Sequence, residues 1–193
     1  MRKILIILSI ISFVACNSSK KSTAGNTAKY TLENLENMDS EELAKAFPDA
    51  NIEEGSDFYD EGTDERPYSI LYPGTTDELH ITWQDEDRKK IHDLRYTKNG
   101  KWNTKTGIKI GDSYDQLVTL NKAPISFYGF GWDYSGAVDW KDGRLKNSEI
   151  RAFLSPQNEI PNEFYGDHVI EATPEQIQAL DLKVSSIIIN YGV

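Results

Sequence analysis

Few side chains in this sequence of 193 residues could carry out catalysis. It has one cysteine, Cys16, and three histidines, His80, His92 and His168. None of them stands in a metalloprotease, serine-hydrolase or phosphate-loop motif, and one cysteine forms neither an internal disulfide nor a cysteine-based zinc site. His80 and His92 alternate with apolar residues, so we expect both to face solvent. We therefore predict no enzyme, no cofactor and no metal site; a hydrolase whose site is assembled from dispersed residues is the least favoured alternative.

An aromatic segment, FYGFGWDYSG at residues 127–136, is a candidate binding element. On an extended strand four of its rings share one face: Tyr128, Phe130, Trp132 and Tyr134. Buried, these rings would pack in the core, with the glycines relieving the crowding. Exposed, they would form a patch of the kind that anchors a protein or glycan partner. The sequence leaves both interpretations open.

Charge is unevenly distributed along the chain. Residues 31–87 contain 18 Asp or Glu, with Lys45 and Arg66 as the only basic residues, whereas residues 88–110 contain eight Lys or Arg. One interpretation is a solvated acidic face beside a basic edge strand that resists aggregation. The other is an acidic surface that speeds association with a basic protein partner.

Within the acidic part, the segment EEGSDFYDEGTDE supplies further candidates for partner binding. They are Asp57, Asp60, Glu61 and Asp64. The same carboxylates could hold calcium, which prefers oxygen ligands, but the segment does not match the EF-hand loop. We predict no metal here and keep calcium as the alternative.

The composition is that of an acidic, folded domain. The formal net charge is −10, 38 % of the residues are hydrophobic and 11 % are aromatic. Nucleic acid is not an expected partner, because its phosphates need Lys and Arg to neutralise them. The aromatic content favours a β-rich fold.

Capping signals predict three short helices, at residues 39–47, 113–120 and 173–180. Each begins with Asp, Ser or Thr and carries Glu or Gln three residues later. Alternating apolar residues predict strands at residues 67–72, 78–83, 90–97, 125–130, 136–140, 149–154 and 184–191. The fold class is therefore α+β, with short helices packed on a twisted antiparallel sheet.

Two local patterns refine this expectation. Ile187, Ile188 and Ile189 are consecutive in the last strand, which suggests a strand covered on both faces. Asn99 and Gly100 predict a tight hairpin turn that leads toward Trp102.

An internal repeat is suggested by two similar segments. LHITWQD aligns with GAVDWKD, which matches Trp83 with Trp140, and downstream of them Arg95 matches Arg151. Each copy would be a helix followed by a meander that carries one inward-facing tryptophan.

The predicted domain organisation has three parts. Residues 1–15 form a signal peptide and residues 16–29 a flexible tether rich in Ser, Thr, Asn and Gly. Residues 30–193 form a single α+β domain, with repeat one at about residues 31–104 and repeat two at about residues 105–193.

The N-terminal segment MRKILIILSIISFVAC begins with Arg2 and Lys3 and continues as an apolar run of about 12 residues, well short of the roughly 20 that span a membrane. Its end, Ala15 followed by Cys16, resembles a bacterial lipoprotein box. The resemblance implies that Cys16 is acylated and anchors a soluble domain to the membrane. Asn17 in place of Asp implies the outer membrane, with the domain facing the periplasm and the cell surface as the alternative.

The segment GIKIGDSYDQLVTLNKAP, residues 107–124, resembles the signature of the BamE/SmpA/OmlA lipoproteins and the related β-lactamase-inhibitor-protein-like (BLIP-like) fold. The matching positions are Gly111, Ser113, Leu117 and Pro124. Asn121 stands where Gly is usual, and Asp112 where Met is frequent. The resemblance implies tandem helix-plus-sheet units, lipid anchoring and protein–protein binding in place of catalysis.

We therefore expect a lipid-anchored, non-enzymatic envelope protein of a Gram-negative bacterium that binds a protein partner. It would serve as an assembly accessory or as an inhibitor or immunity-type module. A lipoprotein that binds a glycan or another small ligand is the alternative.

Overall fold

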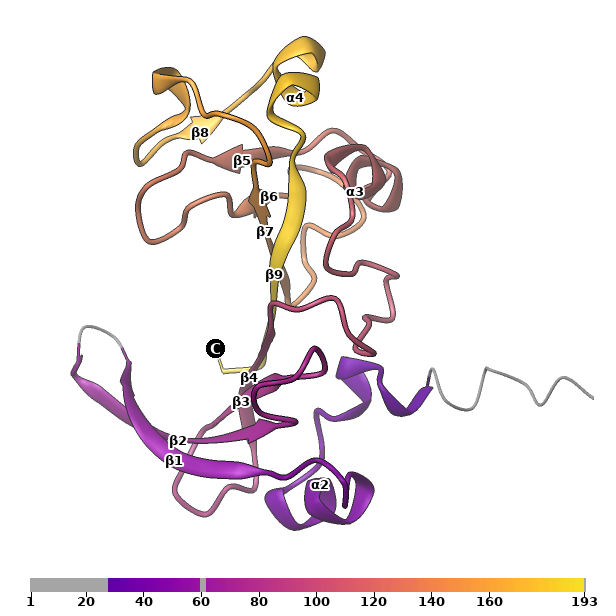
Figure 1. Ribbon diagram of the computed structural model, residues 1–193, viewed down its shortest axis with the longest axis vertical. Helices are drawn as coiled ribbons and strands as arrows, with labels where there is room; N and C mark the ends of the chain where they lie inside the picture. Colours follow the sequence, from indigo (N-terminus) through magenta and orange to yellow (C-terminus); the bar gives the residue numbers. More distant parts are fainter. Residues whose placement is uncertain (1–27, 60–61, 193) are drawn as a thin grey trace, which may run out of the picture.

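The computed structural model describes residues 28–59 and 62–192 of the chain. It shows the α+β fold that the sequence predicts, with short helices packed on antiparallel sheets (Figure 1). Several predicted features lie outside the described residues: the leader 1–15, Cys16, most of the tether, Asp60 and Glu61.

The α-helices of the described residues begin where the capping signals place them. They are α2 (Ser40–Ala46), α3 (Tyr114–Asn121) and α4 (Pro174–Leu180). The Asp39 carboxylate accepts a hydrogen bond from the Glu42 amide at 2.8 Å, and Ser113 and Thr173 accept equivalent bonds at 3.3 Å. These bonds satisfy amides that have no partner in the first helical turn. Single turns of 3₁₀-helix include η1 (Leu32–Asn34) and η3 (Asn162–Phe164) among the described residues.

The main sheet has six antiparallel strands in the order β1-β2-β3-β4-β9-β7. Their bounds are β1 (Glu53–Tyr59), β2 (Asp64–Leu71), β3 (Leu79–Trp83), β4 (Ile91–Tyr96), β7 (Ile150–Ser155) and β9 (Lys183–Asn190). A smaller sheet has the order β6-β5-β8, with β5 (Ser126–Tyr128), β6 (Val138–Asp139) and β8 (Val169–Ile170). Figure 1 shows β7 and β9 running along the long axis of the molecule, so they link the end that carries α2 to the end that carries α3 and α4.

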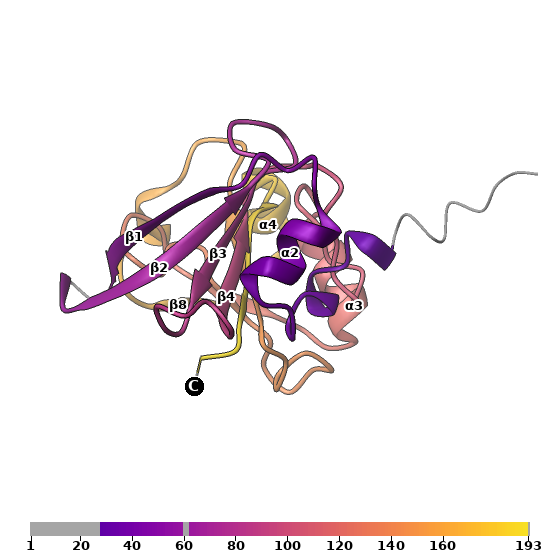
Figure 2. The same ribbon diagram turned by 90° about the horizontal axis from the view of Figure 1, so that it is seen from below.

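Helices cover one face of the main sheet. Figure 2 shows α2 lying to one side of the strands β1 to β4. The side chains on this covered face are fully or almost fully buried: Leu79, Ile81, Trp83, Leu94, Ile150, Ala152, Ile187 and Ile189. Leu43 and Phe47 of α2 and Leu117 of α3 belong to the same apolar cluster. Burial of this kind, at about 25 cal/mol per Å² of apolar surface, is what stabilises the fold.

The opposite face of the main sheet carries exposed and half-buried side chains. In one row across the strands, Arg151 and Arg95 each lie directly opposite Ile188, and His80 lies opposite Arg95. Ile188 is only half-buried. The prediction that the run of isoleucines is covered on both faces is therefore wrong, because no helix of the described residues packs over Ile188.

One further prediction fails and one strand was not predicted, each for an identifiable reason. The hairpin leading to Trp102 does not form, because the neighbours of β4 in the sheet are β3 and β9. Trp102 instead packs in a loop, with its ring 5.2 Å from that of Tyr30 and 5.5 Å from that of Phe47. Strand β1 was not predicted, because its sequence EEGSDFY is mostly polar and lacks apolar alternation.

The two suggested repeats resemble each other in part. Trp83 and Trp140 are both buried, and each indole N–H donates a hydrogen bond within the core, to the Ser69 hydroxyl at 2.9 Å and to the Ile150 carbonyl at 3.1 Å. Trp83 belongs to the main sheet, whereas Trp140 follows β6 of the smaller sheet. Because β9 pairs with β4, strands from both predicted halves build one continuous sheet.

Candidate functional site

The aromatic segment leaves its strand earlier than predicted. Strand β5 ends at Tyr128, and Gly131 adopts a φ of 85°, a conformation that other residues rarely tolerate. As a result Phe130 turns inward, where it is 4 % exposed and its ring lies 5.6 Å from that of Phe127. The prediction that four rings share one face is therefore wrong for Phe130, which belongs to the core.

The other three rings of the segment form a ladder at the surface. The Trp132 ring lies 5.9 Å from that of Tyr128 and 5.2 Å from that of Tyr134. The indole N–H of Trp132 donates a hydrogen bond to the Gly129 carbonyl at 2.8 Å, which fixes the position of the ring. Tyr134 is 54 % exposed, so this end of the ladder is available to a partner.

The ladder borders a hollow of about 490 Å³ that we call the aromatic groove. Its main lining residues are Tyr128, Trp132, Tyr134, Arg151, Phe153 and Asp167. Arg151 and Phe153 come from β7 and belong to the uncovered face of the main sheet. In Figure 1 the loop after β5 projects on the side of the molecule opposite α2 and α3. The aromatic groove is therefore continuous with the uncovered sheet face.

The candidate carboxylates of the acidic segment lie on the hairpin of β1 and β2. Asp57 is exposed on β1 opposite Arg66, and the Asp64 carboxylate forms an ion pair with the same Arg66. They are not brought to the aromatic groove. Among the described residues no group of three or more His, Cys, Asp or Glu is arranged to hold a metal ion.

The charge polarity of the sequence is offset in part by ion pairs. Three basic residues of the 88–110 segment reach back to acidic residues of the preceding segment: Arg88 to Glu54 at 2.7 Å, Lys98 to Glu78 at 3.1 Å and Lys101 to Asp77 at 2.5 Å. Strand β4, the strand within this basic segment, is not an edge strand, because it lies inside the main sheet between β3 and β9. The predicted basic edge strand is therefore wrong. Exposed acidic residues without an ion pair remain in the described part of the acidic segment, among them Glu36, Asp57 and Glu86.

The histidines are dispersed. His80 is exposed and its Nε2 lies 3.3 Å from the Glu78 carboxylate. His92, predicted to face solvent, is half-buried with Nδ1 2.9 Å from the Asp93 carboxylate, and His168 is exposed. In the described part of the chain, the side-chain hydrogen bonds of these rings go to the Glu78 and Asp93 carboxylates, and no serine hydroxyl is bonded to them.

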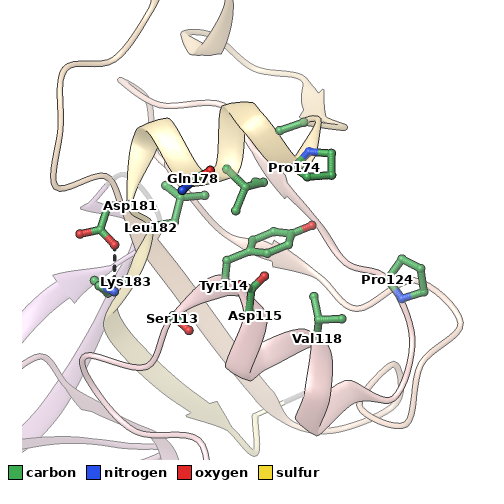
Figure 3. Close-up of a pocket in the computed structure, with 12 residues that line it drawn as sticks. Ser113, Tyr114, Asp115, Val118, Pro124, Pro174, Gln178, Asp181, Leu182 and Lys183 are labelled. Carbon is green, nitrogen blue, oxygen red and sulfur yellow. Dashed lines mark ion pairs between the residues drawn. The ribbon is translucent and has the colours of Figure 1, made fainter.

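A second hollow, of about 640 Å³, lies between α3 and α4 (Figure 3). The close-up shows the Tyr114 ring between the two helices, with Val118 and Pro124 beside it and Asp181 bonded to Lys183 at the rim. The Tyr114 hydroxyl donates to the Ile125 carbonyl at 2.6 Å, and burial raises its pKa. This hollow was not predicted from the sequence. The sequence signal for it is the apolar pair Tyr114 and Val118, which gives α3 a second apolar stripe besides Leu117.

Neither a protein family nor a curated protein matches this chain. Among solved structures, the chain is similar to the crystal structure of the uncharacterized protein yfeY from Escherichia coli, with a TM-score of 0.48 and 17 % sequence identity. The match covers 78 % of this chain and 86 % of that chain. In addition, no helix among the described residues has the length and apolar character needed to cross a membrane. None of these findings assigns an activity to the chain.

Proposed function

We propose that this chain is a lipid-anchored, non-enzymatic protein of the bacterial envelope that binds a protein partner through the aromatic groove. The observation that carries this proposal is the end of the aromatic ladder, the half-buried Trp132 and the exposed Tyr134, beside the uncovered face of the main sheet. Tryptophan, tyrosine and arginine are the residues that most often dominate the binding energy of protein interfaces. The aromatic groove presents all three residue types, in Trp132, Tyr134 and Arg151.

The position of the N-terminal end supports the same proposal. The described chain begins at residue 28, and Tyr30 packs against Phe47 and Trp102 on the side of the molecule that carries α2. A tether leaving from there, attached to an acylated Cys16, would leave the aromatic groove on the far side of the domain. A partner could then reach the groove without displacing the anchor.

The resemblance of residues 107–124 to the BamE/SmpA/OmlA and BLIP-like signature favours the same class of function. Within it, an assembly accessory and an inhibitor or immunity-type module both fit a groove next to an uncovered sheet face. A glycan ligand is the alternative, because sugars also stack on exposed aromatic rings.

Capture from native envelopes tests the proposed function. The immobilised domain should retain a protein, and the Trp132→Ala, Tyr134→Ala variant should retain at least tenfold less of it, because the loss of two anchoring rings costs about 2–4 kcal/mol of binding energy. Quantitative mass spectrometry of the retained proteins measures the difference.

The matched control is Phe58→Ala, which removes another strongly exposed ring, 62 % accessible, from the hairpin of β1 and β2. It should capture as much protein as the wild type, and all forms should show the same thermal unfolding. Equal retention by the wild type and the groove variant would overturn the proposal, and retention of glycan without protein would favour the alternative.

The lipid anchor has its own test. Radiolabelled fatty acid should enter the wild-type protein and be absent from the Cys16→Ser variant, because Cys16 is the only thiol in the chain. The variant should be released from the membrane while its domain stays folded, since the acyl chains and not the domain hold it there. Equal labelling of the two forms would refute lipidation.

A further inference from the structure

We propose that the protein partner presents an acidic, extended segment, which lies across the uncovered sheet face with its carboxylates on Arg95 and Arg151. This inference rests on the proposed function and names the chemistry of the partner. The site is the arginine row, defined as Arg95, Ile188 and Arg151, together with the adjoining aromatic groove.

The two arginines of the row are unpaired. The other arginines of the described residues each have a partner: Arg66 the Asp64 carboxylate, Arg88 the Glu54 carboxylate and Arg144 the Leu120 carbonyl. Arg95 and Arg151 are exposed and have neither a hydrogen bond nor an ion pair within the described part of the chain. The guanidinium groups that lack a partner are therefore the two that flank Ile188.

Nearby carboxylates do not neutralise the row. Asp93, which lies two residues before Arg95 on the same face, is bonded to His92 at 2.9 Å. Glu78 accepts a bond from the Gly74 amide at 2.6 Å and further bonds from Lys98 and His80, and these bonds lower its pKa. Asp167 also lines the aromatic groove with Arg151 but forms no ion pair with it in the described part of the chain. Both guanidinium groups of the arginine row therefore keep their donors free, in a protein whose net charge is −10.

The spacing of the row fits an extended chain. Arg95 and Arg151 are separated by the one strand β9, so their Cβ atoms lie about 10 Å apart, twice the distance between neighbouring strands. Side chains on one face of an extended peptide repeat about every 7 Å. Because arginine side chains are long and flexible, acidic residues at every second position of the partner can reach both guanidinium groups and form bidentate bonds.

The row leads directly into the aromatic groove. Phe153 lies two residues beyond Arg151 on the same face of β7 and lines the groove together with Trp132. Ile188 between the arginines offers an apolar contact. The expected partner segment therefore alternates carboxylates with apolar residues and ends in an aromatic or aliphatic side chain that enters the groove.

Two pools of short synthetic peptides test the inference. In both pools Tyr, Val, Gly and Ser vary at alternate positions; the remaining positions are all Glu in one pool and all Lys in the other. At low salt the wild-type domain should retain the Glu pool about tenfold over the Lys pool, and added salt should reduce this preference because it screens exposed charges. The Arg95→Gln, Arg151→Gln variant should lose the preference.

The matched control is Lys105→Gln, Lys122→Gln, which removes two positive charges from exposed positions on the side of the molecule that carries the helices. It should keep the preference of the wild type, so that a general effect of net charge is separated from an effect of the arginine row. Arg95→Lys, Arg151→Lys should keep part of the preference, because lysine retains the charge but not the bidentate geometry.

The inference is overturned if the wild type retains neither pool, if it retains both equally, or if the preference survives in the Arg95→Gln, Arg151→Gln variant. Its failure is distinct from failure of the proposed function. Protein capture that depends on Trp132 and Tyr134 would persist in that case, and only the acidic character of the partner would be refuted.

Discussion

Trp83→Ala should lower the free energy of unfolding by about 4 kcal/mol. Trp83 is fully buried on the covered face of β3, and its indole N–H donates to the Ser69 hydroxyl at 2.9 Å. The substitution removes the apolar surface of a large ring and leaves a cavity that the rigid sheet cannot close. Because most domains are stable by only about 5–15 kcal/mol, this variant should lie near the limit of folding. Urea denaturation followed by circular dichroism measures the change.

Trp83→Phe separates volume from hydrogen bonding at the same position. It keeps most of the ring but removes the donor to Ser69, so we expect a loss of about 1–2 kcal/mol. A Trp83→Ala variant within about 1 kcal/mol of the wild type would show that the covered face repacks, contrary to the close-packed core described above.

Asn121→Gly should cost about 3 kcal/mol, although glycine is the usual residue at this position of the signature that residues 107–124 resemble. Asn121 ends α3 and is fully buried. Its amide nitrogen donates to the carbonyls of Trp140 at 2.9 Å and Ala123 at 3.2 Å, and its oxygen accepts from the Leu145 amide at 3.1 Å. Glycine would leave the buried Leu145 amide without this partner and would remove one of the two bonds to the Trp140 carbonyl, which also accepts from the Gly143 amide at 3.0 Å. It would also weaken the helix end by about 1 kcal/mol more.

Lys122→Gly provides the matched control at the next residue. Lys122 has a φ of 59° and caps the helix in the left-handed conformation, which glycine adopts without strain. The same substitution should therefore change the free energy of unfolding by less than about 1 kcal/mol. Thermal or urea unfolding of the two variants measures the difference between them. An equal loss in the free energy of unfolding would mean that the Asn121 side chain does not stabilise the loop at residues 140–145.

The parts of the fold that sequence patterns predicted are those governed by local interactions. All three capping boxes form, because the cap and the third helical residue are neighbours along the chain. The alternation of β3 also holds, with Leu79 and Ile81 on the covered face and His80 on the other. Local periodicity fixes which face of a strand is apolar, but not which strand becomes its neighbour.

The predictions that failed concern features that depend on contacts between residues far apart in the sequence. Phe130 turns into the core because the chain bends at Gly129 and Gly131; a Cβ at Gly129 would lie 2.4 Å from the carbonyl oxygen of Gly166. Within the acidic segment, Glu54 is paired because the Arg88 side chain reaches it from a position 34 residues further along the chain. Neither the bend nor the ion pair has a signal within a short window of sequence.

The candidate site lies between these cases. Tyr128, Trp132 and Tyr134 were predicted as candidate binding residues because they are aromatic, and the repeat alignment matched Arg95 with Arg151. It did not show that Ile188 of the last strand enters between the two arginines and places them in one row. That arrangement follows from the strand order of the main sheet, which no local pattern specifies.

The central claim, that a protein partner occupies the aromatic groove, is tested most directly by photo-crosslinking in cells that make the protein. A benzophenone amino acid placed at position 134, at the rim of the groove, should form an adduct with one protein partner on illumination. The same probe at Gln178, at the rim of the hollow between α3 and α4, should give no such adduct. An adduct at position 178 with none at position 134 would contradict the account.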